Sequence, residues 1–157
     1  MRVGIGFDAH PFAEGRALKL GGVKIAHPRG LSGHSDGDAL LHAVADALLG
    51  AAGLGSLGEH FPDGSDAGRG ADSAVLLGRV AGLVGEAGFR VGNVDVVVIA
   101  EAPKIAPHVP AVRSRLAEIL GIEAGRVSVR GTTSNGLGFT GRGDGIAAVA
   151  VALLEEI

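Results

Sequence analysis

One carboxylate and two imidazoles near the start of the chain have the residue types and spacing of a metal-ligand set. Asp8 and His10 lie two residues apart in Gly-Phe-Asp-Ala-His, and His42 ends the segment His-Ser-Asp-Gly-Asp-Ala-Leu-Leu-His. On an extended strand, residues two apart point to the same face of the sheet. One carboxylate and two imidazoles suit an open zinc site, which leaves one coordination position for substrate. The pattern indicates a metal-dependent enzyme.

Each of these residues also has an ordinary structural explanation. A D-x-H triplet occurs often by chance, and an aspartate at a strand end often forms a turn. The case for a metal depends on convergence, because a strand end would supply two ligands and the polar face of a helix the third. Asp46, four residues after His42, is either a partner that orients the histidine or a solvated surface charge.

Further polar residues suit the binding of phosphate. His34 precedes a predicted helix, where free backbone N–H groups attract anions, although it is otherwise an ordinary loop histidine. Thr132-Thr133-Ser134-Asn135 leads into a glycine-rich stretch that contains Arg142, and these groups either bind phosphate or form an ordinary polar loop. Lys104 either holds a phosphate or is an exposed lysine.

Alternating and β-branched segments predict four strands and one hairpin. They are residues 1–7, 17–26 (a hairpin that turns at Gly21-Gly22), 90–101, 127–130 and 146–154. A helix is the alternative for the last of these, because its periodicity does not decide between the two. Residues 27–34 and 53–70 are predicted to be loops, and a loop as long as the second is often functional.

The first predicted helix should carry His42. Ser35 is its predicted N-cap, Asp38 completes a capping-box pattern three residues later, and the helix should run to about Ala52. Asp38, His42 and Asp46 are spaced by four residues and form a polar stripe. His42 should therefore be available to groups outside its own helix.

Two more helices complete the predicted elements. One spans residues 72–87, and the other starts near 107–110 and ends before Gly121. The sequence contains neither an internal repeat nor a linker. The simplest interpretation is a single α+β domain over residues 1–157.

Composition excludes several classes of protein. The 157 residues are 46% apolar and 20% charged, which is typical of a globular domain with its own core. The net charge is −3 without a basic run, which argues against a nucleic-acid partner. The chain has no cysteine, so a metal must bind to His, Asp or Glu. Without a signal peptide or a membrane-spanning stretch, we expect a cytoplasmic protein with no membrane partner.

Several motifs occur in one order along the whole chain. They are residues 6–10, 34–38 with 40–42, Phe-Pro-Asp at 61–63, Ala-Pro-Lys at 102–104 and Leu-Gly-Phe-Thr-Gly-Arg-Gly at 137–143. Together they resemble the 2-C-methyl-D-erythritol 2,4-cyclodiphosphate synthase family of the non-mevalonate isoprenoid pathway. The resemblance implies an α+β domain whose mixed sheet carries three main helices on one side, assembled as a homotrimer with active sites between subunits.

The activity that the resemblance implies is that of a phosphorus–oxygen lyase. The substrate is 4-diphosphocytidyl-2-C-methyl-D-erythritol 2-phosphate, whose 2-phosphate attacks the β-phosphorus of its own diphosphate. CMP leaves and a cyclic 2,4-diphosphate forms. Such a reaction fits the residues, because bound cations can neutralise two phosphates that repel each other.

The resemblance also implies roles for particular residues. Asp8, His10 and His42 would bind zinc, with manganese as the alternative, and His34 and Thr133 would stabilise the transition state. Cytosine would be held by backbone groups of residues 100–106, residues 61–65 would line the erythritol side, and an isoprenoid diphosphate would bind on the trimer axis. The implied substrate-binding positions are Ser35, Ser56, Gly58, Phe61, Asp63, Ser65, Ala100, Lys104, Ala106, Thr132, Asn135, Phe139 and Arg142.

Two positions depart from the family pattern. The family usually has Glu where this chain has Asn135, and that carboxylate helps to hold a second divalent ion, magnesium or manganese, on the diphosphate. Asn is neutral and a weaker ligand for a hard cation, so we expect weaker binding of this ion or binding mainly through phosphate oxygens. The family usually has Asp, a ribose contact, where this chain has Ser56, so we expect a lower nucleotide affinity.

Two other functions are compatible with the same residues. In a metal-dependent phosphoesterase a metal-bound water would attack, and the products would be linear phosphates. In a non-catalytic trimer that binds isoprenoid diphosphates through Phe139 and Arg142, replacing His42 by alanine would leave the ligand affinity unchanged.

Overall fold

The computed structural model describes residues 1–66 and 68–157. Its main sheet has five strands in the order β4-β1-β7-β5-β6, and a separate hairpin pairs β2 with β3. The strands are β1 (Arg2–Ala13), β2 (Leu18–Leu20), β3 (Val23–Ile25), β4 (Gly30–Leu31), β5 (Phe89–Ile99), β6 (Val127–Thr132) and β7 (Gly145–Glu156). β7 runs antiparallel to both β1 and β5, whereas β5 and β6 are parallel. The sheet is therefore mixed, as predicted.

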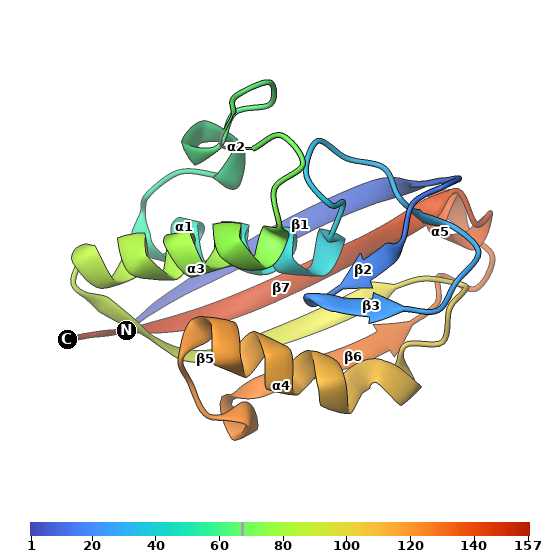
Figure 1. Ribbon diagram of the computed structural model, residues 1–157. Helices are drawn as coiled ribbons and strands as arrows, with labels where there is room; N and C mark the ends of the chain where they lie inside the picture. The colour runs from blue at the N-terminus through green and yellow to red at the C-terminus, as the bar shows by residue number, and fades with distance from the viewer. Residues whose placement is uncertain (67) are drawn as a thin grey trace.

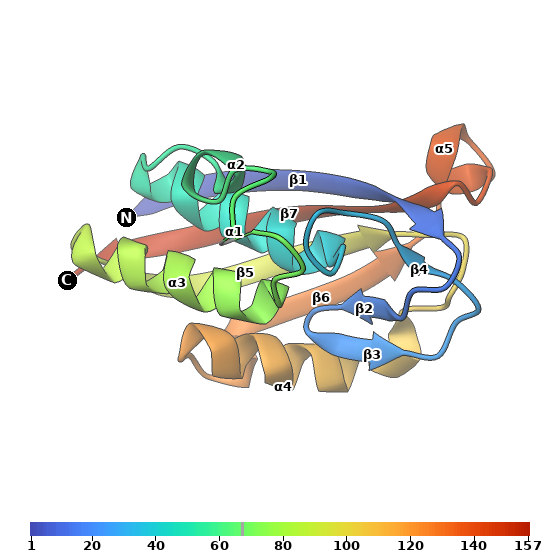
Figure 2. The ribbon, with the colours of Figure 1, turned by 45° about the horizontal axis from the view of Figure 1, so that its top comes forward.

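The three long helices cover one face of this sheet (Figures 1 and 2). The helices are α1 (Ala39–Ala52), α2 (Leu57–His60), α3 (Ser73–Glu86), α4 (Val109–Leu120) and α5 (Gly138–Gly141), with 3₁₀ turns η1 (Ala106–His108) and η2 (Ala124–Arg126). This arrangement confirms an α+β fold with helices on one side. Within the described residues, no helix combines the length and apolarity needed to cross a membrane.

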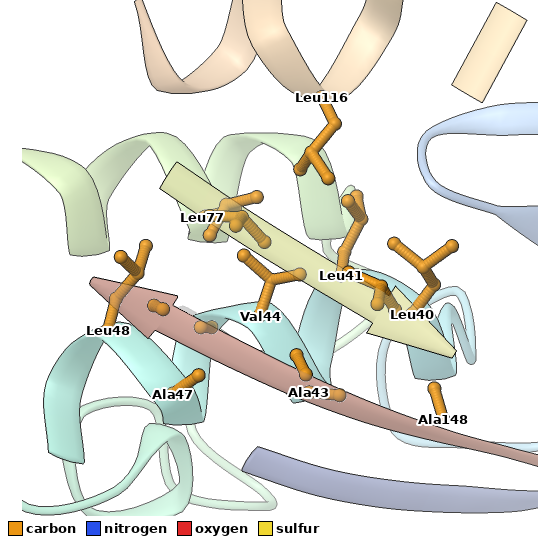
Figure 3. Close-up of a cluster of buried hydrophobic side chains, with 14 of the residues drawn as sticks. Leu40, Leu41, Ala43, Val44, Ala47, Leu48, Leu77, Leu116 and Ala148 are labelled. Atoms are coloured by element: carbon orange, nitrogen blue, oxygen red, sulfur yellow. The ribbon is translucent and has the colours of Figure 1, made fainter. Parts of the chain in front are cut away.

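The buried core lies between the helices and the sheet. Figure 3 shows Leu41 and Val44 of α1 beside Leu77 of α3 and Leu116 of α4. The side chains of these residues are at most 1% exposed. The apolar faces of three helices thus meet over the strands, and the polar side of α1 is left for His42.

Two glycines let α1 lie directly on the backbone of β1. A Cβ added to Gly6 would lie 1.9 Å from the carbonyl oxygen of Ala43, and one added to Gly4 would lie 2.0 Å from that of Ala47. No side chain fits such a gap, so glycine is required by the close approach. Asp8 is two residues further along the same face of β1 and therefore reaches the helix that carries His42.

Replacing Gly6 by alanine is expected to lower the free energy of unfolding by about 3 kcal/mol, because the new methyl group collides with backbone that cannot move alone. The matched control is Gly78→Ala on α3, where an added Cβ meets no atom within 4 Å. That variant is expected to be as stable as the unaltered protein or more so. Urea denaturation followed by circular dichroism measures both. Equal denaturation midpoints for Gly6→Ala and the unaltered protein would contradict the close-packing argument.

The predicted start of the first helix was wrong. The N-cap is Asp38, not Ser35, because the Asp38 carboxylate accepts hydrogen bonds from three backbone N–H groups. Leu41 donates one at 3.1 Å, and Gly21 and Gly22 of the β2–β3 turn donate the others at 3.0 and 2.8 Å. Burial raises the pKa of Asp38 to about 6, and these N–H groups act in the opposite direction.

The other predicted elements are confirmed or lengthened. The hairpin turns at Gly21-Gly22 with positive φ at both residues, as a two-residue type I′ turn requires. Residues 146–154 lie in strand β7, so the helical alternative is wrong. β1 continues to Ala13, and the predicted loops contain β4 and α2. Residue 67, in the second of these loops, lies outside the described residues.

Candidate metal centre

β1 and α1 bring Asp8, His10 and His42 together. Asp8 Oδ2 lies 2.7 Å from His10 Nε2 and 3.0 Å from His42 Nδ1, and these two ring nitrogens are 3.2 Å apart. One ligand atom from each residue lies within 4.8 Å of the other two, so the group could hold a metal ion. The predicted convergence of a strand end and a helix face is confirmed.

The donor set fits a divalent metal. His10 Nδ1 lies 2.7 Å from the carbonyl oxygen of Ser32, which can only accept, so Nδ1 carries the proton and Nε2 presents a lone pair. That lone pair faces the carboxylate oxygen of Asp8 and His42 Nδ1. Acceptor atoms that converge in this way require either a shared proton or a cation between them.

The electrostatics of the group agree with this geometry. Burial raises the pKa of the Asp8 carboxyl, but the two neighbouring imidazoles, His10 and His42, together outweigh that effect, so its pKa lies below the usual value of 3.8. The hydrogen bond to Asp8 raises the pKa of His10 above 6.5 despite the opposing effect of burial. The site therefore favours a carboxylate with positive charge beside it, and a divalent cation supplies the same complement.

The three residues line a cleft of about 330 Å³. His34 and Ser35, from the loop before α1, also line it, and Asp46 lies on the α1 side. The predicted substrate-binding residues that reach the cleft from the region of α2 are Gly58, Phe61 and Asp63. Ser56 and Ser65 are turned to local partners instead, as Ser56 donates to Glu59 at 3.2 Å and Ser65 to the Pro62 carbonyl at 2.6 Å.

His34 is exposed and held by its surroundings. Its Nε2 accepts a hydrogen bond of 2.8 Å from Gly64 N–H, so Nδ1 carries the proton and is available to donate. Arg16 donates to the carbonyl oxygens on either side, at 3.0 Å for Gly33 and 2.7 Å for Ser35. The loop therefore presents a fixed N–H donor at the cleft.

The remaining predicted residues lie elsewhere in the chain. Ala100 N–H donates to the carbonyl oxygen of Thr132 at 3.0 Å, which joins the segments that follow β5 and β6. Among the described residues, none from 100–106 or 132–135 lines the cleft. Counted across the paired strands from Asp8 on β1, Gly131 on β6 is the third residue. The two residues therefore lie three strand spacings, or about 14 Å, apart. Within one chain, the predicted site residues therefore form two separate groups, one at the cleft and one in the segments that follow β5 and β6.

Lys104, Ala106, Thr133 and Asn135 are exposed in this second group. Asn135 has a φ of 55°, a left-handed conformation that Asn tolerates better than most residues. Phe139 and Arg142 lie on and beside α5, at the end of the sheet opposite the two termini (Figure 2). Phe139 is 41% exposed, and Arg142 pairs with Asp144 at 3.0 Å.

Three residues near the centre were not anticipated from the sequence. Ser73 Oγ lies 2.8 Å from His42 Nε2, Asp36 bonds to Ser73, and Arg16 holds the His34 loop. Asp46, considered as a partner of His42, instead accepts a 2.6 Å hydrogen bond from Leu57 N–H and so positions α2. In the sequence, Ser73 is recognisable only as a residue at the start of a helix, and such a position does not indicate a metal centre.

Curated relatives match the chain over nearly its full length. A 2-C-methyl-D-erythritol 2,4-cyclodiphosphate synthase from Marinobacter nauticus is 57% identical over 157 residues, which are 100% of this chain and 99% of the relative. The enzyme of the same name from Pseudomonas putida is 56% identical over 154 residues, or 98% of each chain.

Solved structures agree with these relatives. The bifunctional IspDF from Campylobacter jejuni matches with a TM-score of 0.96 at 42% identity, over 99% of this chain, and this chain spans 42% of that protein. A 2C-methyl-D-erythritol-2,4-cyclodiphosphate synthase in its CDP-bound form matches with a TM-score of 0.90 at 38% identity, over 98% of this chain and 100% of that one. A sequence model of the YgbB family matches residues 1–155. The chain therefore belongs to the YgbB family, and the resemblance seen in its motifs is confirmed.

Proposed function

We propose that this protein is a 2-C-methyl-D-erythritol 2,4-cyclodiphosphate synthase, the activity for which its relatives are named. The 2-phosphate oxygen of the cytidyl substrate forms a bond to the β-phosphorus, and the bond from that phosphorus to the bridging oxygen breaks. CMP leaves with the electron pair, so the enzyme is a phosphorus–oxygen lyase. The observation that carries the proposal is the convergence of Asp8, His10 and His42 in a cleft that His34 also lines.

We propose zinc as the metal, with manganese as the alternative, because two of the three donors are imidazole nitrogens. Asp8, His10 and His42 would hold it through Oδ2, Nε2 and Nδ1. When bound, the ion supplies positive charge that reduces the repulsion between the two phosphates. The substrate is its own nucleophile, so the site needs no general base to activate water.

His34 and Thr133 would donate hydrogen bonds to the charge that develops on the phosphate oxygens. His34 Nδ1 carries the proton because Nε2 accepts from Gly64. Thr133 Oγ1 accepts from Asn135 N–H at 3.2 Å, which leaves the hydroxyl proton free to donate. Donors fixed in this way before the reaction stabilise the transition state by an amount that corresponds to about 10²–10³ in rate.

The rest of the substrate would occupy the segments that the family pattern indicates. Backbone groups of residues 100–106 would hold cytosine, Lys104 a phosphate, and Phe61 with Asp63 the erythritol. We propose that the second ion, magnesium or manganese, is bound chiefly by phosphate oxygens, because the neutral Asn135 amide is a weak ligand for it. The CDP-bound form of one solved relative supports a cytidine diphosphate ligand.

A homotrimer would unite the two groups of residues. The sheet face opposite the helices exposes Val3, Ile5 and Phe7 of β1 by 68%, 70% and 59%, and Val151 of β7 by 41%. Contiguous apolar surface of this kind is usually covered by another chain. We propose that a neighbouring subunit covers it and brings its own residues 100–106 and 132–135 to the cleft. Phe139 and Arg142 would then face an isoprenoid diphosphate on the trimer axis.

Phosphorus NMR of the purified protein with the cytidyl diphospho-methylerythritol phosphate substrate tests the function. With zinc present, we expect a cyclic diphosphate and CMP, and a faster reaction when magnesium is added. Linear phosphates would show a phosphoesterase instead. Unchanged substrate in both samples would overturn the proposal and favour the non-catalytic trimer.

A further inference from the structure

The Asp36 carboxylate lies behind the metal centre and acts as an acceptor on both oxygens. Oδ1 accepts a 3.1 Å hydrogen bond from Asp38 N–H, and Oδ2 accepts one of 3.0 Å from Ser73 N–H. A backbone N–H can only donate, so each oxygen of Asp36 must be the acceptor in its hydrogen bond. The side chain is 14% exposed, and Lys19 Nζ lies 4.0 Å from Oδ2.

Ser73 therefore has to donate its hydroxyl proton to Asp36. Its Oγ is in close hydrogen-bond contact with Asp36 Oδ1. Ser73 is the first residue of α3 and only 1% exposed, so no bulk water competes for the hydroxyl. A hydroxyl has one proton, and once it is directed at Asp36 only lone pairs remain for other neighbours.

The neighbour that faces those lone pairs is His42. Its Nε2 lies 2.8 Å from Ser73 Oγ, so Nε2 must carry the proton and donate it. In a neutral imidazole the other nitrogen, Nδ1, then presents a lone pair. That atom is the one that faces Asp8 Oδ2 at 3.0 Å and His10 Nε2 at 3.2 Å.

We propose that Asp36 and Ser73 are positioning residues that fix the tautomer and the ring orientation of His42 for metal binding. The inference rests on the metal centre of the proposed function. It adds two successive hydrogen bonds, from the metal ligand His42 to the Ser73 hydroxyl and from that hydroxyl to the Asp36 carboxylate. Groups of this kind behind a metal-bound histidine raise metal affinity because the ring need not be reoriented or lose a proton from the wrong nitrogen.

Ser35 offers a matched control. Its Oγ is 3.1 Å from His42 Nε2 and 3.4 Å from Ser73 Oγ, so it also contacts the ring, at a longer distance than Ser73. Asp36 bonds to Ser73 and so directs that hydroxyl, whereas a hydroxyl at Ser35 can rotate to suit the ring. Removing the Ser35 hydroxyl should therefore leave the tautomer unchanged.

Zinc affinity, measured by competition with a chromophoric chelator, tests the proposal without turnover. Ser73→Ala is expected to bind zinc about 10- to 100-fold more weakly than the unaltered protein, and Ser35→Ala to stay within about threefold. Asp36→Asn is expected to weaken zinc binding at least as much as Ser73→Ala, because an amide NH₂ replaces one acceptor oxygen. Equal affinities for Ser73→Ala and the unaltered protein would overturn the proposal.

A second measurement covers the case in which a variant fails to fold, which thermal unfolding in the presence of a chelator would reveal. In the zinc-loaded unaltered protein, proton NMR should show a slowly exchanging His42 Nε2–H with cross-peaks to Ser73. A rapidly exchanging proton, or cross-peaks to Ser35 alone, would overturn the inference. A strong Ser73 effect on zinc affinity in a protein that forms no cyclic product would instead contradict only the proposed function.

Discussion

Replacing His42 by alanine is expected to remove the bound zinc and to lower the rate of cyclisation by about a thousandfold or more. Asp8 and His10 alone leave two ligands in a site built for three. A metal contributes several kcal/mol of charge stabilisation to such a transition state, and each 1.4 kcal/mol is a factor of ten in rate. Zinc per chain, measured by mass spectrometry of the metal, and single-turnover release of CMP check the two expectations.

The control for this variant is His27→Ala. His27 stacks on Phe12 at 5.2 Å between ring centroids and bonds to Arg29, away from the centre. It should retain one zinc per chain and the full rate. Retention of both zinc and activity by His42→Ala would contradict this assignment, because the ligand set would then lie elsewhere.

Mixing two inactive variants is expected to restore activity if the sites lie between subunits. His42→Ala lacks a metal ligand but keeps its Thr133, whereas Thr133→Ala keeps the metal centre of its own chain. In any trimer that contains both chains, one of the three interfaces pairs an intact centre with an intact Thr133. Co-expression with two affinity tags and purification over both should therefore give about a third of the unaltered activity.

The structure motivates this experiment because residues 132–135 are displaced from the cleft of the same chain. A site assembled within one chain predicts a different result, since every chain in the mixture would carry one defect. The activity of the mixture would then be no more than the sum of its parts. His42→Ala chains that carry both tags and pass through the same two columns provide the baseline.

The sequence predicted most of the features that depend on local patterns. Alternating residues marked the long strands, and the paired glycines at 21–22 marked the hairpin, because each turn or strand is encoded within a few residues. The ligands of the candidate centre were also predicted. Their chemistry is unusual enough to be recognised from residue types, and β1 and α1 had the lengths needed to bring them together.

The features that could not be predicted from the sequence depend on contacts between distant parts of the chain. Ser35 looked like an N-cap, but the N–H groups that decide the cap include those of Gly21 and Gly22, 17 and 16 residues from Asp38. Ser73 lies 31 residues from His42, and a serine that begins a helix has no pattern that would reveal this contact. Asp46 has the correct spacing for a partner of His42, yet the side chain turns to Leu57.

The buried carboxylate of Asp38 has a consequence for how the protein opens. It accepts N–H groups from both the β2–β3 turn and the first turn of α1, the turn before His42. If the hairpin detaches, the buried carboxylate that caps the helix loses two of its three donors at once. Partial opening of either element alone is costly, so amide exchange in the hairpin and at the start of α1 should occur together, as one cooperative unit that takes the metal centre with it.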